Sequence, residues 1–163
     1  MSSYICSYFD EHDHVSLVDK NIVIDSMINL SRCNEAGAVS TFLGTTRDTF
    51  EDKIVTHLSY EAYNDMAIES MKEICKKIRL QWNVIKIVIQ HKIGDCPVGE
   101  ISVLIAISSA HRNESLQAIQ FAIDELKRTV PIWKKEYYNN DDNNGNNAQW
   151  KKNVEFDMLA HKQ

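Results

Sequence analysis

Two segments decide how this chain folds: Ser109-Ala110-His111-Arg112 and Leu126-Lys127-Arg128-Thr129-Val130-Pro131-Ile132-Trp133-Lys134-Lys135-Glu136. The first follows a β-type run, 101–107, and opens a helical run. The second ends that helix and restarts the chain after Pro131. Four cationic side chains and no carboxylate lie between Lys127 and Lys135, although the net charge of the chain is -5. A basic cluster on an acidic background indicates an anionic ligand rather than a generally adhesive surface.

Length and composition limit the class of protein. The 163 residues, 44% of them hydrophobic, suffice for one domain with a real core but hardly for two. No window approaches the roughly 18 unbroken apolar residues of a membrane span, and residues 1–9 lack the regions of a secretory signal. The acidic balance argues against broad nucleic-acid binding, which needs an extended basic face. We therefore expect a soluble, cytoplasmic protein with no membrane and no nucleic-acid partner.

Neither the cysteines nor the histidines indicate a metal site. The cysteines are scattered and form no closely spaced pair: Cys6, Cys33, Cys75 and Cys96. Cys75 falls on the apolar face of a helical pattern and is expected in the core. Cys96 is expected in a loop, where it could be reactive, but an ordinary reduced thiol is favoured because Asp95 supplies no electropositive setting. His12 and His14 are interpreted as part of a solvated loop, since no third ligand lies nearby.

Hydrophobic periodicity predicts an α+β sandwich with a mixed, largely antiparallel sheet and three helices. The expected strands are 4–9, 37–44, 54–60, 84–90, 100–108 and 132–138, and the expected helices are 19–29, 64 or 65 to 78, and 112–130. Asp19 and either Asn64 or Asp65 are expected to cap the first two helices. The third helix is expected to bury a stripe of apolar residues: Leu116, Ile119, Ala122, Ile123 and Leu126.

The connections follow from the same patterns. Residues 54–60 are expected to pair with 37–44 as a hairpin, and 91–99 to form a loop. Residues 1–138 are interpreted as one domain, 139–149 as an asparagine-rich mobile insertion, and 150–163 as a C-terminal tail.

The helix that starts at Arg112 is expected to favour an anion at its N-terminus, where backbone N–H groups are free and Arg112 can add a bidentate clamp. Lys127 lies near the other end of this helix, about 24 Å from His111 at roughly 1.5 Å per residue. The two residues cannot act on one atom within a single chain, so we expect either an extended groove or a site shared between two copies.

Lys127 and Lys134 lie on either side of Pro131, and a turn there could bring both ammonium groups to one pocket. Partly desolvated lysines can act as acid, base or nucleophile. The alternative is a helix C-terminus decorated with lysines, which the helix dipole favours in any case. Arg47, at the exit of a strand, is interpreted either as a ligand-binding residue or as the partner of a neighbouring carboxylate.

Four blocks of sequence resemble the MoaE family, the large catalytic subunit of molybdopterin synthase. They are Gly37-Ala38-Val39 through Phe42, Gly44, Thr45 and Arg47; His91 to Gly94; Ser108-Ser109-Ala110-His111-Arg112; and Leu126-Lys127 with Pro131, Trp133, Lys134, Lys135 and Glu136. The serine-alanine-histidine-arginine and proline-x-tryptophan-lysine blocks are the most specific part. Trp150-Lys151-Lys152-Asn153 also resembles the tail of eukaryotic-type members.

The resemblance implies an α/β hammerhead fold and a sulfur-transfer reaction. Family members convert cyclic pyranopterin monophosphate (precursor Z) into molybdopterin by inserting two dithiolene sulfurs. The sulfur donor is the C-terminal thiocarboxylate of a small ubiquitin-like subunit, and the large subunit forms the central homodimer of a heterotetramer. The resemblance implies no cofactor and no metal.

Roles for individual residues are also implied by the resemblance. Lys127 and Lys134 would be catalytic. The implied substrate-binding residues are Phe42, Thr45, Thr46, Arg47, His111, Arg112, Lys135 and Glu136. Bacterial members extend a C-terminal arginine into the neighbouring subunit's site. No arginine follows Arg128 in this chain, so Lys151 and Lys152 are the candidates to replace it.

A second hypothesis is a binding module that holds a phosphorylated metabolite or a ubiquitin-like tail without chemistry. Both hypotheses explain Arg47, His111 and Arg112. Only an enzyme explains why Lys127 and Lys134 should converge.

Overall fold

The computed structural model describes residues 4–139 and 148–151, which form two sheets and three helices. The first sheet contains, in spatial order, β1 (Tyr4–Phe9), β2 (Asp13–Val18), β6 (Val84–Lys92), β8 (Ile101–Ser109) and β3 (Ala38–Thr45). The second contains β10 (Ala148–Lys151), β9 (Ile132–Tyr138), β5 (Lys53–Ala62) and β4 (Thr49–Phe50), and β7 (Gly94–Pro97) also pairs with β5. Among the described strands β2 and β6 pair in parallel and the other pairs are antiparallel. The α+β prediction is confirmed.

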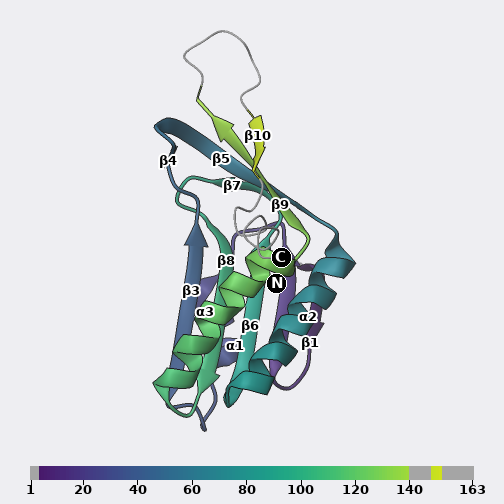
Figure 1. The fold of residues 1–163 in the computed structure, drawn as a ribbon, viewed down its shortest axis with the longest axis vertical. Helices are drawn as coiled ribbons and strands as arrows, with labels where there is room; N and C mark the ends of the chain where they lie inside the picture. The colour runs from purple at the N-terminus through teal and green to yellow at the C-terminus, as the bar shows by residue number, and fades with distance from the viewer. Residues whose placement is uncertain (1–3, 140–147, 152–163) are drawn as a thin grey trace, which may run out of the picture.

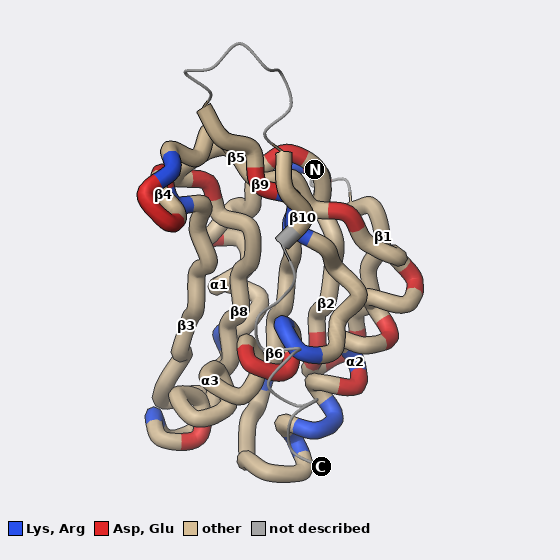
Figure 2. The backbone as a smooth tube through the Cα atoms, turned by 45° about the horizontal axis from the view of Figure 1, so that its top comes forward, with Lys and Arg blue, Asp and Glu red and all other residues tan. Residues whose placement is uncertain are grey.

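The helices cover both faces of the first sheet (Figure 1). The helices are α1 (Ile24–Ser31), α2 (Asn64–Gln81) and α3 (Arg112–Thr129). α2 and α3 lie side by side over one face and enclose the larger core cluster, while α1 covers the other face. Because both faces are covered, β8 is apolar almost throughout and buried from Ser102 to Ser109. Figure 2 shows no charged residue along β3 or β8. Among the helices described, none has the length and apolar character needed to cross a membrane.

The helical patterns are mostly confirmed. The buried residues of α2 are those expected from their spacing: Ala67, Ile68, Met71, Ile74, Cys75 and Ile78. In α3 the expectation for Leu116 was wrong, because its side chain is 57% exposed. Ser115 is buried in its place, with its hydroxyl 2.8 Å from that of Ser40 on β3. A satisfied hydroxyl can occupy a core position, so apolar spacing alone selected the wrong residue.

β2 was missed because its sequence looks like a polar break. His14 and Ser16 are buried in this strand, not in a solvated loop. The His14 Nε2 and Ser16 Oγ atoms are 3.1 Å apart, and the Gln90 side chain donates to Ser16 at 3.0 Å. Burial lowers the pKa of His14 to about 4, so the imidazole is neutral at physiological pH. Buried polar residues that hydrogen-bond to one another interrupt the alternation of apolar and polar residues, so the sequence pattern did not indicate a strand here.

Three further expectations were wrong. The strand at 54–60 does not pair with β3: β3 pairs with β8, and β5 pairs with β4, β7 and β9. The first helix begins at Ile24 with no side-chain cap, and α2 likewise has no side-chain cap at its N-cap, Tyr63. The expected loop at 91–99 contains the short strand β7. Most of the predicted insertion and tail lie outside the described residues, although Ala148–Lys151 forms β10 against β9.

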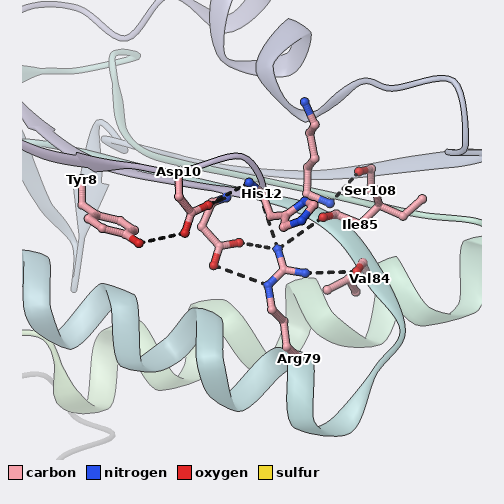
Figure 3. A network of polar contacts seen from close by, with 9 residues as sticks. Tyr8, Asp10, His12, Arg79, Val84, Ile85 and Ser108 are labelled. Atoms are coloured by element: carbon pink, nitrogen blue, oxygen red, sulfur yellow. Dashed lines mark hydrogen bonds and ion pairs between the residues drawn. The ribbon is translucent and has the colours of Figure 1, made fainter.

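Arg79 on α2 contacts the residues at the starts of β2 and β6 (Figure 3). Its guanidinium forms an ion pair with the Asp13 carboxylate and donates to the backbone oxygens of His12, Val84 and Ile85 at 3.4, 3.2 and 3.3 Å. The planar guanidinium can satisfy several acceptors that a lysine ammonium could not reach together.

We predict that Arg79→Ala lowers the free energy of unfolding by about 2–3 kcal/mol, because three carbonyls and a half-buried carboxylate lose their donor. Lys76→Ala is the matched control, since Lys76 pairs with Glu73 on the exposed face of α2. Its effect should stay within about 0.5 kcal/mol. Urea denaturation of the three proteins measures both effects, and equal midpoints for the two variants would refute the role of Arg79.

Candidate active site

A cavity of about 600 Å³ lies where the first sheet, the end of α3 and the second sheet meet. Its lining comes from both sheets and from the helix end: Phe42, Gly44, Thr45, Tyr60, His91, Ser102, Val103, Ile123, Leu126, Lys127, Thr129, Val130, Pro131, Ile132, Trp133 and Lys134. Among these described residues Lys127 and Lys134 carry the only formal charges, and no carboxylate is present. The cavity therefore favours one anionic group within largely apolar walls.

The turn at Pro131 brings the two lysines to this cavity. α3 ends at Thr129, and the Val130 amide donates to the Leu126 carbonyl at 3.1 Å. Proline disfavours helix at the preceding residue, so the chain turns and enters β9 at Ile132. Lys127 on the helix and Lys134 on the strand consequently line one space. Their catalytic roles stay predictions.

Glu136, which does not line the cavity, forms an ion pair with Lys134. Its carboxylate is buried, with Oε1 2.9 Å from the Lys134 ammonium and Oε2 accepting from the Tyr138 hydroxyl at 2.6 Å. Burial, followed by this hydrogen bond, raises the pKa of the Tyr138 phenol, which therefore stays a donor. Glu136 does not line the cavity itself; it fixes the direction of the Lys134 ammonium.

His91 and Tyr60 are cavity residues that sequence reasoning missed. The His91 Nδ1 atom lies 2.7 Å from the Lys92 carbonyl oxygen. Burial lowers the pKa of His91 to about 4 and raises that of Tyr60 to about 12, so both are neutral. The alternation of side chains along the strand could have identified His91, because it follows Ile87 and Ile89 on the face that packs toward α3.

Gly44 allows β3 to approach β8 closely at the cavity wall. A Cβ atom placed on Gly44 would lie 2.7 Å from a Val103 methyl group and 3.4 Å from the Phe42 ring. Any side chain here would therefore clash with that wall.

The other predicted site residues do not line the cavity within one chain. Arg47 is exposed, with its guanidinium 5.9 Å from the centre of the Phe50 ring. His111 and Arg112 are exposed at the start of α3, at the end of the helix away from Lys127 (Figure 1). The Lys135 ammonium lies 5.4 Å from the centre of the Trp150 ring, on the outer face of β9 and β10.

Thr46 and Cys96 form a buried contact beside the site. The Thr46 hydroxyl donates to the Cys96 carbonyl at 3.2 Å and also contacts its thiol. Burial raises the pKa of the Cys96 thiol, so this cysteine is not a reactive loop residue. Thr46 thus joins β3 to β7, and its predicted contact with substrate stays a prediction.

Comparison with known proteins decides the family. A family model described as MoaE protein matches residues 17–129. The chain belongs to the MoaE family. The match begins at Leu17, near the end of β2, includes α2 and α3, and ends at the last residue of α3.

Named MoaE relatives resemble the chain closely. The molybdopterin synthase catalytic subunit of Drosophila melanogaster is 49% identical over 144 residues, which are 88% of this chain and 38% of that protein. The Arabidopsis thaliana subunit of that name is 45% identical over 149 residues, 90% of this chain and 72% of that protein. The crystal structure of molybdopterin synthase from Staphylococcus aureus superposes with a TM-score of 0.77 at 30% identity, covering 88% of this chain and 98% of that one. The chain spans well under half the length of the Drosophila relative.

Gly44→Ala should lower the free energy of unfolding by about 1–3 kcal/mol, because the added methyl group overpacks the wall against Val103. Val103→Ala opens space at that point, so the double variant should be at least about 1 kcal/mol more stable than the sum of the two single effects. Denaturation of the four proteins completes the cycle. Strict additivity would show that the Gly44–Val103 contact does not limit this position.

Proposed function

We propose that the chain is the catalytic subunit of a molybdopterin synthase, acting in the cytoplasm. It transfers sulfur from the C-terminal thiocarboxylate of a small ubiquitin-like subunit to precursor Z, forming the dithiolene of molybdopterin. The observation that carries the proposal is the pairing of Lys127 and Lys134 on one cavity whose other described lining residues are uncharged. Membership of the MoaE family and the names of its relatives support the same reaction.

The chemistry follows from the charges. The tail of the small subunit ends in an anionic thiocarboxylate, which two ammonium groups can attract and align. Once the sulfur is bonded to the pterin carbon, water attacks the acyl carbon and negative charge develops on the acyl oxygen; the carbon–sulfur bond then breaks, leaving the sulfur on the pterin and a carboxylate on the tail. Lys127 and Lys134 then stabilise that charge inside a partly dry cavity, where such contacts are strongest. Glu136 keeps Lys134 aimed during these steps, and Lys127 is the candidate acid or base.

Precursor Z carries a phosphate, and we assign its binding to Arg47 together with His111 and Arg112 of a second copy. α3 has 18 residues and is therefore about 27 Å long. His111 and Lys127 of one chain are thus too far apart to meet around one pterin. A homodimer resolves this separation, because each copy can supply the group that the other lacks.

β3 suggests how two copies meet. Within the described part of the chain it is an edge strand, paired with β8 on one side only. One end of β3 lies at Gly37 and Ala38, against Ala110 and the start of α3, and the other end lies at Thr45 in the cavity wall. Antiparallel pairing of two such edges about a two-fold axis would place Arg112 of one copy near the cavity of the other.

Lys127→Ala should retain binding of the small subunit but reduce product formation from precursor Z at least about 100-fold, because half of the charge stabilisation is lost. The assay incubates the enzyme with the thiocarboxylated small subunit and precursor Z and detects dithiolene product by mass spectrometry. Lys76→Ala, on the exposed face of α2, is the matched control and should be fully active. Undiminished turnover by Lys127→Ala would refute the catalytic role of Lys127.

A site shared between copies makes a second prediction. Lys127→Ala and Arg112→Ala should each be nearly inactive alone, whereas a mixture allowed to exchange subunits should recover about a quarter of wild-type activity, since half of the dimers are mixed and each has one intact site. Absence of recovery, with exchange demonstrated by native mass spectrometry, would place Arg112 and Lys127 in the same copy's site.

A further inference from the structure

His91 presents a hydrogen-bond acceptor to the cavity. Its Nδ1 lies 2.7 Å from the Lys92 carbonyl oxygen, which can only accept, so Nδ1 carries the proton. The side chain is 5% exposed, and burial keeps it neutral at physiological pH. Nε2 therefore has a free lone pair, and no residue in the described part of the chain donates a hydrogen bond to it.

The polar lining of the cavity consists of His91, Lys127 and Lys134 together with four residues that carry hydroxyl groups: Thr45, Tyr60, Ser102 and Thr129. The sheet wall supplies the acceptor of His91, and the helix end and β9 supply the donors of Lys127 and Lys134. Apolar side chains form much of the remaining wall, including Phe42 and Val103. A ligand that fills this space needs an anionic end near the two lysines and an N–H or O–H donor opposite His91.

The end of an extended peptide has both properties. A peptide terminus has one negative end group and a single amide N–H next to it. A phosphate would be better served by guanidinium groups, and Arg47 and Arg112 lie outside this cavity in the chain. The position of these guanidinium groups therefore favours the donor tail, rather than the pterin phosphate, as the ligand that lies between the two lysines.

We propose that His91 Nε2 accepts a hydrogen bond from the last amide N–H of the sulfur-carrier tail and so sets the register of the thiocarboxylate between the two lysines. This proposal rests on the proposed function for the identity of the tail. His91 is then a positioning residue: it acts through the placement of the donor and makes no bond to the transferred sulfur.

The test removes the hydrogen bond from each side in turn. One probe is a short peptide that ends in two glycines with a free carboxylate; the other is the same peptide with the last amide N–H replaced by an ester oxygen. His91→Asn retains an amide that can donate to the Lys92 carbonyl but removes the acceptor at the Nε2 position. His91→Gln places an amide oxygen near that position and is the rescue variant.

Tryptophan fluorescence reports binding, because Trp133 lines the cavity. In the wild type the ester should bind about tenfold more weakly than the amide. In His91→Asn the affinity for the amide peptide should fall to that for the ester peptide, and the affinity for the ester peptide should not fall further. His91→Gln should recover part of the lost affinity for the amide peptide. If the ester binds the wild type as well as the amide does, or if its deficit persists in His91→Asn, the proposal is overturned.

Turnover separates this proposal from the proposed function. With the thiocarboxylated small subunit, His91→Asn should raise the KM for the donor about tenfold and leave the KM for precursor Z unchanged. A raised KM for precursor Z alone would assign His91 to the pterin and overturn the proposal. If the peptides show the expected coupling but the wild type forms no dithiolene product, the tail site stands and the sulfur-transfer function fails.

Discussion

The reversal of the chain at Pro131 is the constraint on which the site depends. A helix that continued past Thr129 would carry Lys134 away from Lys127, and β9 would have no place beside β5. The turn instead joins the α/β layer to the second sheet and encloses the cavity between them. One local backbone preference thus determines both the junction of the two sheets and the pairing of the cations.

A buried carboxylate, that of Glu136, fixes the direction of the Lys134 ammonium. Glu136 bonds the Lys134 ammonium with one oxygen and the Tyr138 hydroxyl with the other, so its own burial is compensated. Strand alternation explains the arrangement, because Lys134, Glu136 and Tyr138 share one face of β9 while Lys135 points to the other. The two adjacent lysines therefore differ in environment although they are neighbours in sequence.

Local signals in the sequence predicted the elements near the site well. The apolar run of β8, the spacing of α2 and the stop at Pro131 each depend on interactions between nearby residues, and each appears in the structure. Non-local pairings were not predictable in this way. The hairpin assigned to β3 and β5 was wrong because the true partner of β3 is about sixty residues away in β8.

Buried polar residues account for the other failures. His14 and Ser16 satisfy each other inside β2, and Ser115 bonds Ser40 beneath α3, so polarity no longer indicated exposure. His91 lies near the end of β6, and its place at the cavity depends on which elements the fold brings opposite it. The start of α3 at Arg112 and the separation of His111 from Lys127 along this helix were both predictable from the sequence, while the predicted binding of an anion by His111 and Arg112 stays a prediction.

The most direct measurement is a crystal structure of the chain with a bound peptide that ends in a free carboxylate. The account predicts that the terminal carboxylate lies inside the cavity, with the ammonium groups of Lys127 and Lys134 of the same copy each within about 3–4 Å of its oxygens. A carboxylate bound elsewhere, or one contacted by neither lysine, would contradict the claim that these two residues form a single site for the sulfur donor.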